Sequence, residues 1–150
     1  MSNQVEYSLL ARRAEIEVVP SAQHHGMGLL AWSSLGRGVL AGRYRNGTPK
    51  DSRGGSDRLS WFVQPYLTPK SQAVVNAISK AADGLGATTA QMALAWVRDA
   101  PVVSSALVGP RTTTQLEELL GVDDVVLPPE ITSALDDITG GPNLARPEES

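Results

Sequence analysis

The chain has 150 residues and a formal net charge of −3, and 41% of its residues are hydrophobic. This length is typical of a single domain with one modest core. The negative charge argues against a nucleic-acid partner, and the absence of cysteine excludes disulfides, thiolate zinc sites and a cysteine nucleophile. There is no run of about 18 apolar residues that could span a membrane, and no signal peptide follows Met1. We therefore expect a cytoplasmic protein without a membrane or nucleic-acid partner.

The first third of the chain predicts two strands around a short helix. Apolar residues alternate in residues 4–10 and then become continuous, which predicts a strand. Residues 12–25 predict a helix interrupted by Pro20; alternatively, Pro20 lies in the first turn and the helix covers only 21–25. Residues 28–32 form a continuous apolar run bounded by glycine and serine, which is typical of a buried parallel strand.

The rest of the chain alternates long loops with further helices and one more strand. Residues 33–44 form a loop that glycines interrupt, and residues 45–66 form a long polar excursion. The remaining predicted elements are a helix over 68–83 capped by Thr68, a helix from Thr88 or Thr89 to Arg98, a strand over 102–108, a helix from Thr112 or Thr113 to Leu120, and a helix from Pro128 to about Gly140.

Strands that alternate with helices predict an α/β fold with a parallel sheet and right-handed crossovers. Three strands cannot close a barrel, and a (β/α)8 barrel needs about 250 residues. If the fold is related to such a barrel, the chain covers only a portion of it.

Two loops at predicted strand ends could bind a phosphate. In the 33–44 loop, glycines let backbone N–H groups approach an anion, and Arg37 and Arg43 add positive charge. Trp32, just before this loop, offers a flat face on which a ring could stack. The spacing differs from G-x-G-x-x-G, so a plain turn is the alternative.

The second loop, residues 109–115, leads from a strand into the N-terminus of a helix. Free N–H groups there would point toward the same side as the first loop, and Arg111 could form paired hydrogen bonds to a phosphate. A capped helix with a solvated arginine is the alternative reading. Together, the two loops predict a ligand that carries phosphates. No metal site is predicted, because the adjacent His24 and His25 point in different directions.

Three segments, in order, resemble the aldo-keto reductases, in the branch that includes the potassium-channel β subunits. Residues 3–20, which begin Asn-Gln-Val-Glu-Tyr, resemble the sixth barrel strand and its helix. Residues 28–44 resemble the seventh strand and its phosphate loop, and residues 90–97 and 102–115 resemble the last helix, strand and helix. The resemblance implies that residues 1–140 are the C-terminal portion of a (β/α)8 TIM barrel. Residues 141–150 are expected to form a flexible tail.

The resemblance further implies an NADP(H)-dependent oxidoreductase that acts on aldehydes or ketones. The implied cofactor residues are Gln4 for the carboxamide, Trp32 for stacking on the nicotinamide, Ser33, Leu35, Arg37, Gly38 and Arg43 for the pyrophosphate, Arg111, Thr112 and Gln115 for the 2′-phosphate, and Glu118 for adenine. The chain departs from the family pattern at Ser34, where proline is usual, and at Leu119, where asparagine is common.

The catalytic Asp, Tyr, Lys and His of the family lie in its first five strands, so the resemblance assigns no catalytic residue here. We expect the chain alone to be inactive, truncated or split from a complementing N-terminal half, and to take a small carbonyl substrate once the barrel is complete. A non-enzymatic module that binds a dinucleotide or docks onto a partner is the alternative, and an unstable relic is a third. The unpaired sheet edges predict poor folding or self-association of the isolated chain.

Overall fold

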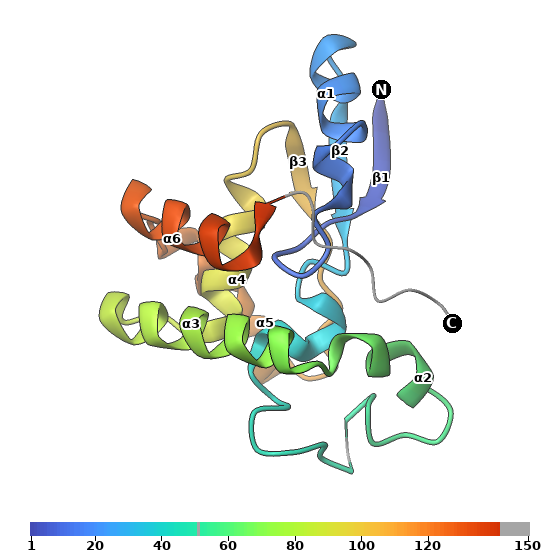
Figure 1. Ribbon diagram of the computed structural model, residues 1–150, viewed down its shortest axis with the longest axis vertical. Helices are drawn as coiled ribbons and strands as arrows, with labels where there is room; N and C mark the ends of the chain where they lie inside the picture. Colours follow the sequence, from blue (N-terminus) through green and yellow to red (C-terminus); the bar gives the residue numbers. More distant parts are fainter. Residues whose placement is uncertain (51, 142–150) are drawn as a thin grey trace.

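The computed structural model describes residues 1–50 and 52–141. Three parallel strands form one sheet in the order β1 (Ser2–Glu6), β2 (Gly28–Trp32) and β3 (Val103–Ala106) (Figure 1). The predicted α/β class with a three-stranded parallel sheet is therefore confirmed. The predicted tail, apart from Gly141, lies outside the described residues.

The first strand is displaced from its predicted position at residues 4–10. β1 ends at Glu6, although the Tyr7 N–H still donates to the Trp32 carbonyl. Ser8 and Ala11 then exchange backbone hydrogen bonds with each other, at 3.2 and 2.9 Å, which turns the chain back. The apolar end of the predicted strand therefore leaves the sheet, and Leu9 enters the core, where it is fully buried.

The helix predicted over residues 12–25 is divided. A 3₁₀ turn, η1, covers Arg13–Glu15, and α1 covers Val18–His24. Pro20 is the third residue of α1, where a missing N–H costs no intrahelical hydrogen bond. Pro20 thus lies in the first turn, as the alternative reading has it, but the helix begins before it.

The other helices agree closely with the sequence pattern, and the side chains of Thr68, Thr88 and Thr112 accept the expected N-cap hydrogen bonds. The predicted excursion over 45–66 contains two short helical segments. The remaining elements are η2 (Gly36–Ala41), α2 (Ser60–Val63), η3 (Gln64–Tyr66), α3 (Pro69–Leu85), α4 (Thr89–Arg98), α5 (Thr113–Leu120), η4 (Gly121–Asp124) and α6 (Pro129–Thr139).

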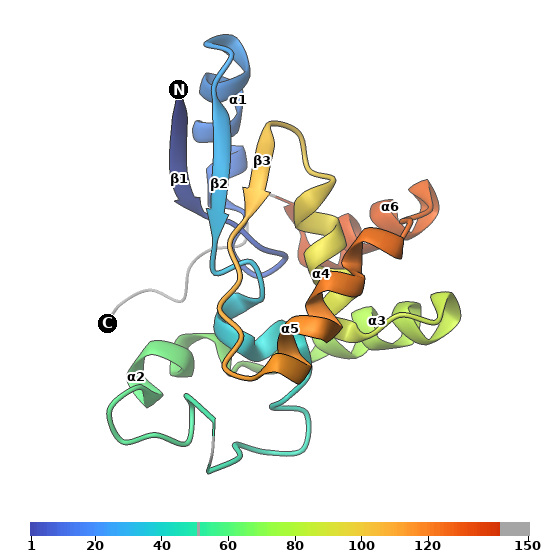
Figure 2. The same ribbon diagram turned by 180° about the vertical axis from the view of Figure 1, so that it is seen from behind.

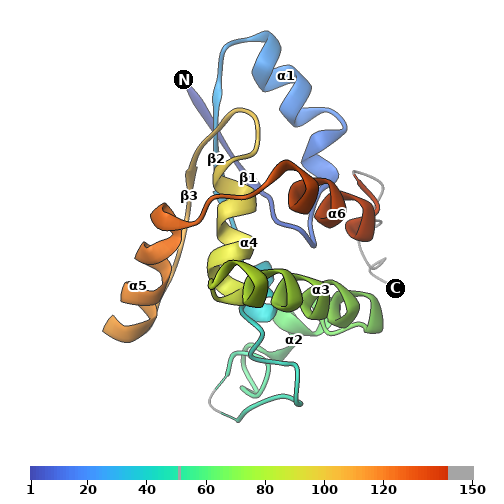
Figure 3. The same cartoon turned by 90° about the vertical axis from the view of Figure 1, so that its left-hand side faces the viewer.

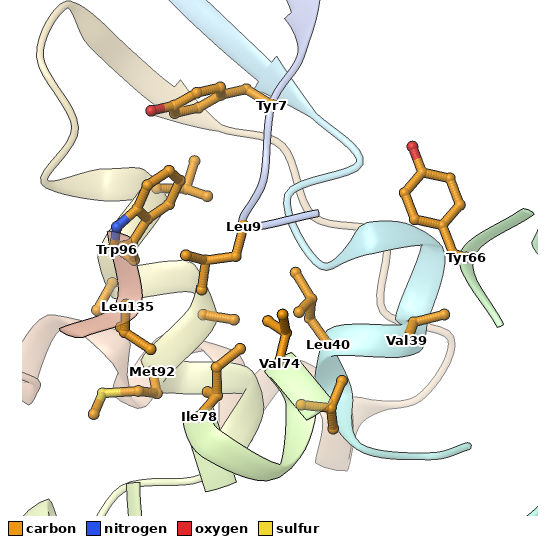
Figure 4. Close-up of a cluster of buried hydrophobic side chains, with 14 of the residues drawn as sticks. Tyr7, Leu9, Val39, Leu40, Tyr66, Val74, Ile78, Met92, Trp96 and Leu135 are labelled. Atoms are coloured by element: carbon orange, nitrogen blue, oxygen red, sulfur yellow. The ribbon is translucent and has the colours of Figure 1, made fainter. Parts of the chain in front are cut away.

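The hydrophobic core lies where α4 meets the sheet, α3 and α6 (Figures 3 and 4). Most residues of α4 are buried, Met92 and Val97 completely. Leu9 and Leu40 reach the same cluster from the turns that follow β1 and β2. The core thus fixes the loops at the carboxyl ends of these strands relative to the helices.

The two faces of the sheet differ in burial. Leu29 and Ala31 of β2 are completely buried, whereas Leu30 and Trp32, on the opposite face, are only partly buried. Figure 2 views the sheet from behind, with α1 on the far side of the strands. Within residues 1–50 and 52–141, no helix is long and apolar enough to cross a bilayer.

Candidate functional site

A cleft of about 320 Å³ lies beyond the carboxyl ends of β2 and β3. The loops that follow these strands, residues 33–44 and 109–115, form two of its walls, and they run side by side in Figures 1 and 2. This β2–β3 cleft contains most of the predicted cofactor residues. They are Trp32, Ser33, Leu35, Arg37, Gly38, Arg43, Arg111, Gln115 and Glu118.

The 33–44 loop owes its shape to a series of left-handed residues. Ser33, Gly36, Arg37 and Gly38 have φ values of 57°, 54°, 58° and 93°. This backbone tightens into η2, where the Gly36 N–H donates to the Ser33 carbonyl at 2.7 Å. Among the described residues, the N–H groups of Ser34 and Leu35 have no acceptor. A turn of this kind can present N–H groups to an anion.

The side chain of Arg37 lines the cleft but also makes several contacts within the protein. Its Nη1 donates to the Phe62 carbonyl at 2.6 Å, and its Nη2 lies 3.2 Å from Oε1 of Glu6. Its guanidinium carbon lies 3.9 Å from the centre of the Phe62 ring and 4.8 Å from that of Tyr66. These contacts tie the 33–44 loop to the end of β1 and to the segment that precedes α3.

The opposite wall begins at Gly109 and continues into the first turns of α5. Thr112 does not line the cleft; its hydroxyl accepts from the Gln115 N–H at 3.2 Å and caps the helix. Oε1 of Gln115 in turn accepts from the Arg111 N–H at 2.8 Å. These two hydrogen bonds fix the backbone that carries the exposed Arg111 side chain at the rim.

The excursion over 45–66 supplies residues that the sequence analysis did not assign to the site. Arg53 and Phe62 line the cleft, together with Tyr44, whose hydroxyl accepts from the Gly54 N–H at 3.1 Å. Nη2 of Arg53 lies 4.0 Å from the position that a Cβ on Gly109 would occupy. Arg53 therefore reaches across to the opposite wall. Its only signal in the sequence is an arginine in a polar, glycine-rich stretch.

Gln4, the predicted carboxamide-binding residue, lies on β1 and does not line the β2–β3 cleft. It is exposed on β1 and lines a second hollow, which shares Trp32 with the first. In the sheet, Gln4 is paired with Leu30 and Glu6 with Trp32. Gln4, Glu6 and Trp32 therefore belong to the same face, with Trp32 at the boundary between the two hollows.

The cleft is basic at its rim. Arg43, Arg53 and Arg111 all line it, and Glu118 is the one carboxylate among the described residues that line it. Within the described part of the chain, no group of three or more His, Asp or Glu residues could hold a metal ion. The arrangement therefore suits a ligand with negative charges and a flat ring, at the boundary marked by Trp32.

Residues 1–139 match the model of the Aldo/keto reductase family. The chain is 35% identical, over 99% of its length, to a Bacillus subtilis (strain 168) protein named uncharacterized oxidoreductase YrpG. It is 37% identical, over 82% of its length, to a probable voltage-gated potassium channel subunit beta of Arabidopsis thaliana. It is 34% identical, over 92%, to a putative subunit of that kind from Schizosaccharomyces pombe.

These alignments cover 43%, 38% and 42% of the respective relatives, so the chain spans about two fifths of their length. The family match extends over all three strands and from α1 to the end of α6. The chain belongs to the aldo-keto reductase family.

Proposed function

We propose that this chain forms the NADP(H)-binding portion of an oxidoreductase that reduces aldehydes or ketones. Membership of the family and the oxidoreductase relative support an oxidoreductase function. The observation that carries the finer assignment is the convergence of the 33–44 and 109–115 loops on one cleft. A barrel closed by further strands would place this cleft at its C-terminal face, where such folds carry their sites.

The residues of the cleft fit a dinucleotide with a 2′-phosphate. The N–H groups of Ser34 and Leu35, which lack an acceptor among the described residues, suit a pyrophosphate. At the rim, Arg53 and Arg111 suit the additional phosphate that distinguishes NADPH from NADH. The N-terminus of α5 adds its dipole on the same side.

Trp32 and Gln4 would orient the reacting ring. Trp32 supplies a flat surface at the boundary of the two hollows, and Gln4 supplies amide hydrogen-bonding groups on the same face of the sheet. When bound, NADPH supplies the hydride, and the protein supplies orientation and electrostatics. In this proposal, the proton donor for the carbonyl comes from strands outside these 150 residues.

Calorimetric titration of the 150-residue chain with NADPH and NADH tests the assignment. We expect NADPH to bind more tightly than NADH. Replacing Arg53 or Arg111 by alanine should weaken NADPH binding about 10- to 100-fold, because a hydrogen bond to a charged group contributes about 1.5–3 kcal/mol. NADH binding should change little in the same variants.

Arg58→Ala is the matched control, because Arg58 is an exposed arginine of the same excursion outside the cleft. It should bind both nucleotides as the parent chain does. Equal affinities for NADPH and NADH, or no binding of either, would overturn the proposal.

A second candidate function comes from the names of two relatives, which describe channel subunits rather than enzymes. It is a module that binds the dinucleotide and docks onto a partner without turnover. The chain joined to the strands that complete the barrel distinguishes the two. Consumption of NADPH with an aromatic aldehyde favours the reductase, whereas tight binding without consumption favours the module.

A further inference from the structure

We infer that Glu6 is a positioning residue of the β2–β3 cleft, which acts through Arg37 and Tyr66. This inference rests on the proposed function, and it concerns the end of the cleft that would bind the pyrophosphate and the nicotinamide. Glu6 belongs to β1, whereas Arg37 belongs to the 33–44 loop and Tyr66 to η3. One carboxylate thus connects three segments that are distant in the sequence.

The contacts of Glu6 are short and shielded from solvent. Its Oε1 accepts from the Tyr66 hydroxyl at 2.8 Å and lies 3.2 Å from Nη2 of Arg37. The side chains of Glu6 and Arg37 are 10% and 13% exposed. An ion pair this deeply buried is costly to break from one side, because the remaining charge loses its partner in a poorly solvated place.

Arg37 transmits this anchorage to the backbone of the loop. Its φ of 58° is unfavourable for a residue with a side chain, so other contacts must hold it there. The hydrogen bond to the Phe62 carbonyl and the contacts with two aromatic rings provide them. The backbone N–H of Arg37 donates to the Ser33 hydroxyl at 3.2 Å, which holds Arg37 against the start of the loop.

The same contacts determine the role of the Arg37 side chain in the cleft. The Arg37 guanidinium is already engaged by a carboxylate and a carbonyl, and its Nε is buried without a hydrogen-bond partner among the described residues. Its charge is therefore largely balanced inside the protein. We accordingly assign Arg37 to shaping the loop rather than to direct contact with phosphates.

The position of the network limits its reach. Glu6 is paired with Trp32 across the sheet, whereas the 109–115 loop lies on the far wall of the cleft. A change at Glu6 should therefore disturb the part of the cleft that would bind the pyrophosphate and the nicotinamide. It should leave the part that would bind the adenosine 2′-phosphate unaffected.

Two ligands separate these parts: NADPH, and adenosine 2′-monophosphate, which lacks the pyrophosphate and the nicotinamide. In the 150-residue chain, Glu6→Gln should weaken NADPH binding about tenfold, equivalent to about 1.4 kcal/mol. Binding of adenosine 2′-monophosphate should stay within about twofold, which is near the resolution of such comparisons. Tyr66→Phe, which keeps the ring beside Arg37, should produce a smaller effect of the same kind. Glu130→Gln, at an exposed carboxylate of α6 outside both hollows, is the control.

Trypsin cleavage provides a readout that needs no cofactor. Loss of the anchorage should accelerate cleavage after Arg58, in the segment just before α2, while cleavage after Lys80 in α3 stays unchanged. The inference fails if Glu6→Gln binds NADPH like the parent chain, or if it loses both ligands equally, which indicates global damage. If the parent chain binds neither ligand, the proposed function itself fails.

Discussion

Arg12 shows how a buried charge can connect the two ends of the described chain. Its guanidinium binds both carboxylate oxygens of Glu15, at 2.8 and 2.9 Å, and reaches Asp136 and Thr139 of α6 at 2.8 and 2.7 Å. It also lies 4.9 Å from the centre of the Trp96 ring. The segment after β1 is thereby held against the last helix.

Arg12→Ala should therefore destabilise the fold strongly. Removing one partner of a buried ion pair costs about 3–5 kcal/mol, and we expect the lower end because the Asp136 side chain is 42% exposed. Urea unfolding measures the change. Arg13→Ala, at the exposed neighbour, should stay within about 0.5 kcal/mol. Similar losses in the two variants would contradict this account.

Tyr7 should make the free energy of unfolding depend on pH in the alkaline range. Burial, followed by the hydrogen bond that its hydroxyl donates to Glu15 at 2.8 Å, raises the pKa of Tyr7 well above its ordinary value of 10.0. Above that pH the unfolded chain releases a proton that the folded protein retains. The contribution of Tyr7 to stability is therefore full below pH 10.0 and declines as the pH rises.

The urea midpoint of the parent chain should accordingly fall as the pH is raised from about 9 to about 11. In Tyr7→Phe the fall should be shallower, because the titrating hydroxyl is gone. Parallel curves for the two proteins would show that other groups cause the pH dependence.

At the scale of elements, local signals predict the helices better than the strands. Thr68, Thr88 and Thr112 identify helix starts, because an N-cap is a matter of neighbouring residues alone. β3 is shorter than the β-prone run over residues 102–108. Val102 adopts a left-handed φ of 60°, and Leu107 lies beyond the strand and lines the cleft, although its N–H still donates to the Ala31 carbonyl. Such departures are set by tertiary contacts that no local pattern reveals.

The candidate site, too, is only partly predictable from the sequence. Loop glycines and arginines at strand ends predict which residues meet in the cleft, because parallel strands bring their carboxyl ends together. The contribution of Arg53 depends instead on contact with a loop far along the chain. The pairing of Glu6 with Arg37 joins positions 31 residues apart and is equally invisible in the sequence.

The N-cap of α5 stabilises a helix whose first turns form one wall of the cleft. Thr112→Ala removes the acceptor for the Gln115 N–H and should lower stability by about 1 kcal/mol. Thr114→Ala, at an exposed residue inside the same helix, should change it little or stabilise it slightly. Thermal unfolding of both variants measures the difference. Equal melting temperatures would show that the cap contributes nothing.

At the scale of the whole molecule, the sheet has two outer strands, β1 and β3, each paired on one side only among the described residues. Unpaired strand edges favour association with other chains. We therefore expect the 150-residue chain to self-associate as its concentration rises, as judged by sedimentation velocity. Asn3→Lys on β1 should weaken the association, and Gln23→Lys on α1 should not. A cooperatively melting monomer at every concentration would contradict the prediction.

The central claim is that the 33–44 and 109–115 loops hold one NADP(H) molecule between them. Mapping of backbone amide chemical shifts during titration with NADPH tests it most directly. We predict that amides of both loops shift together, along one saturation curve. Shifts confined to one loop, or located on another part of the fold, would contradict the claim.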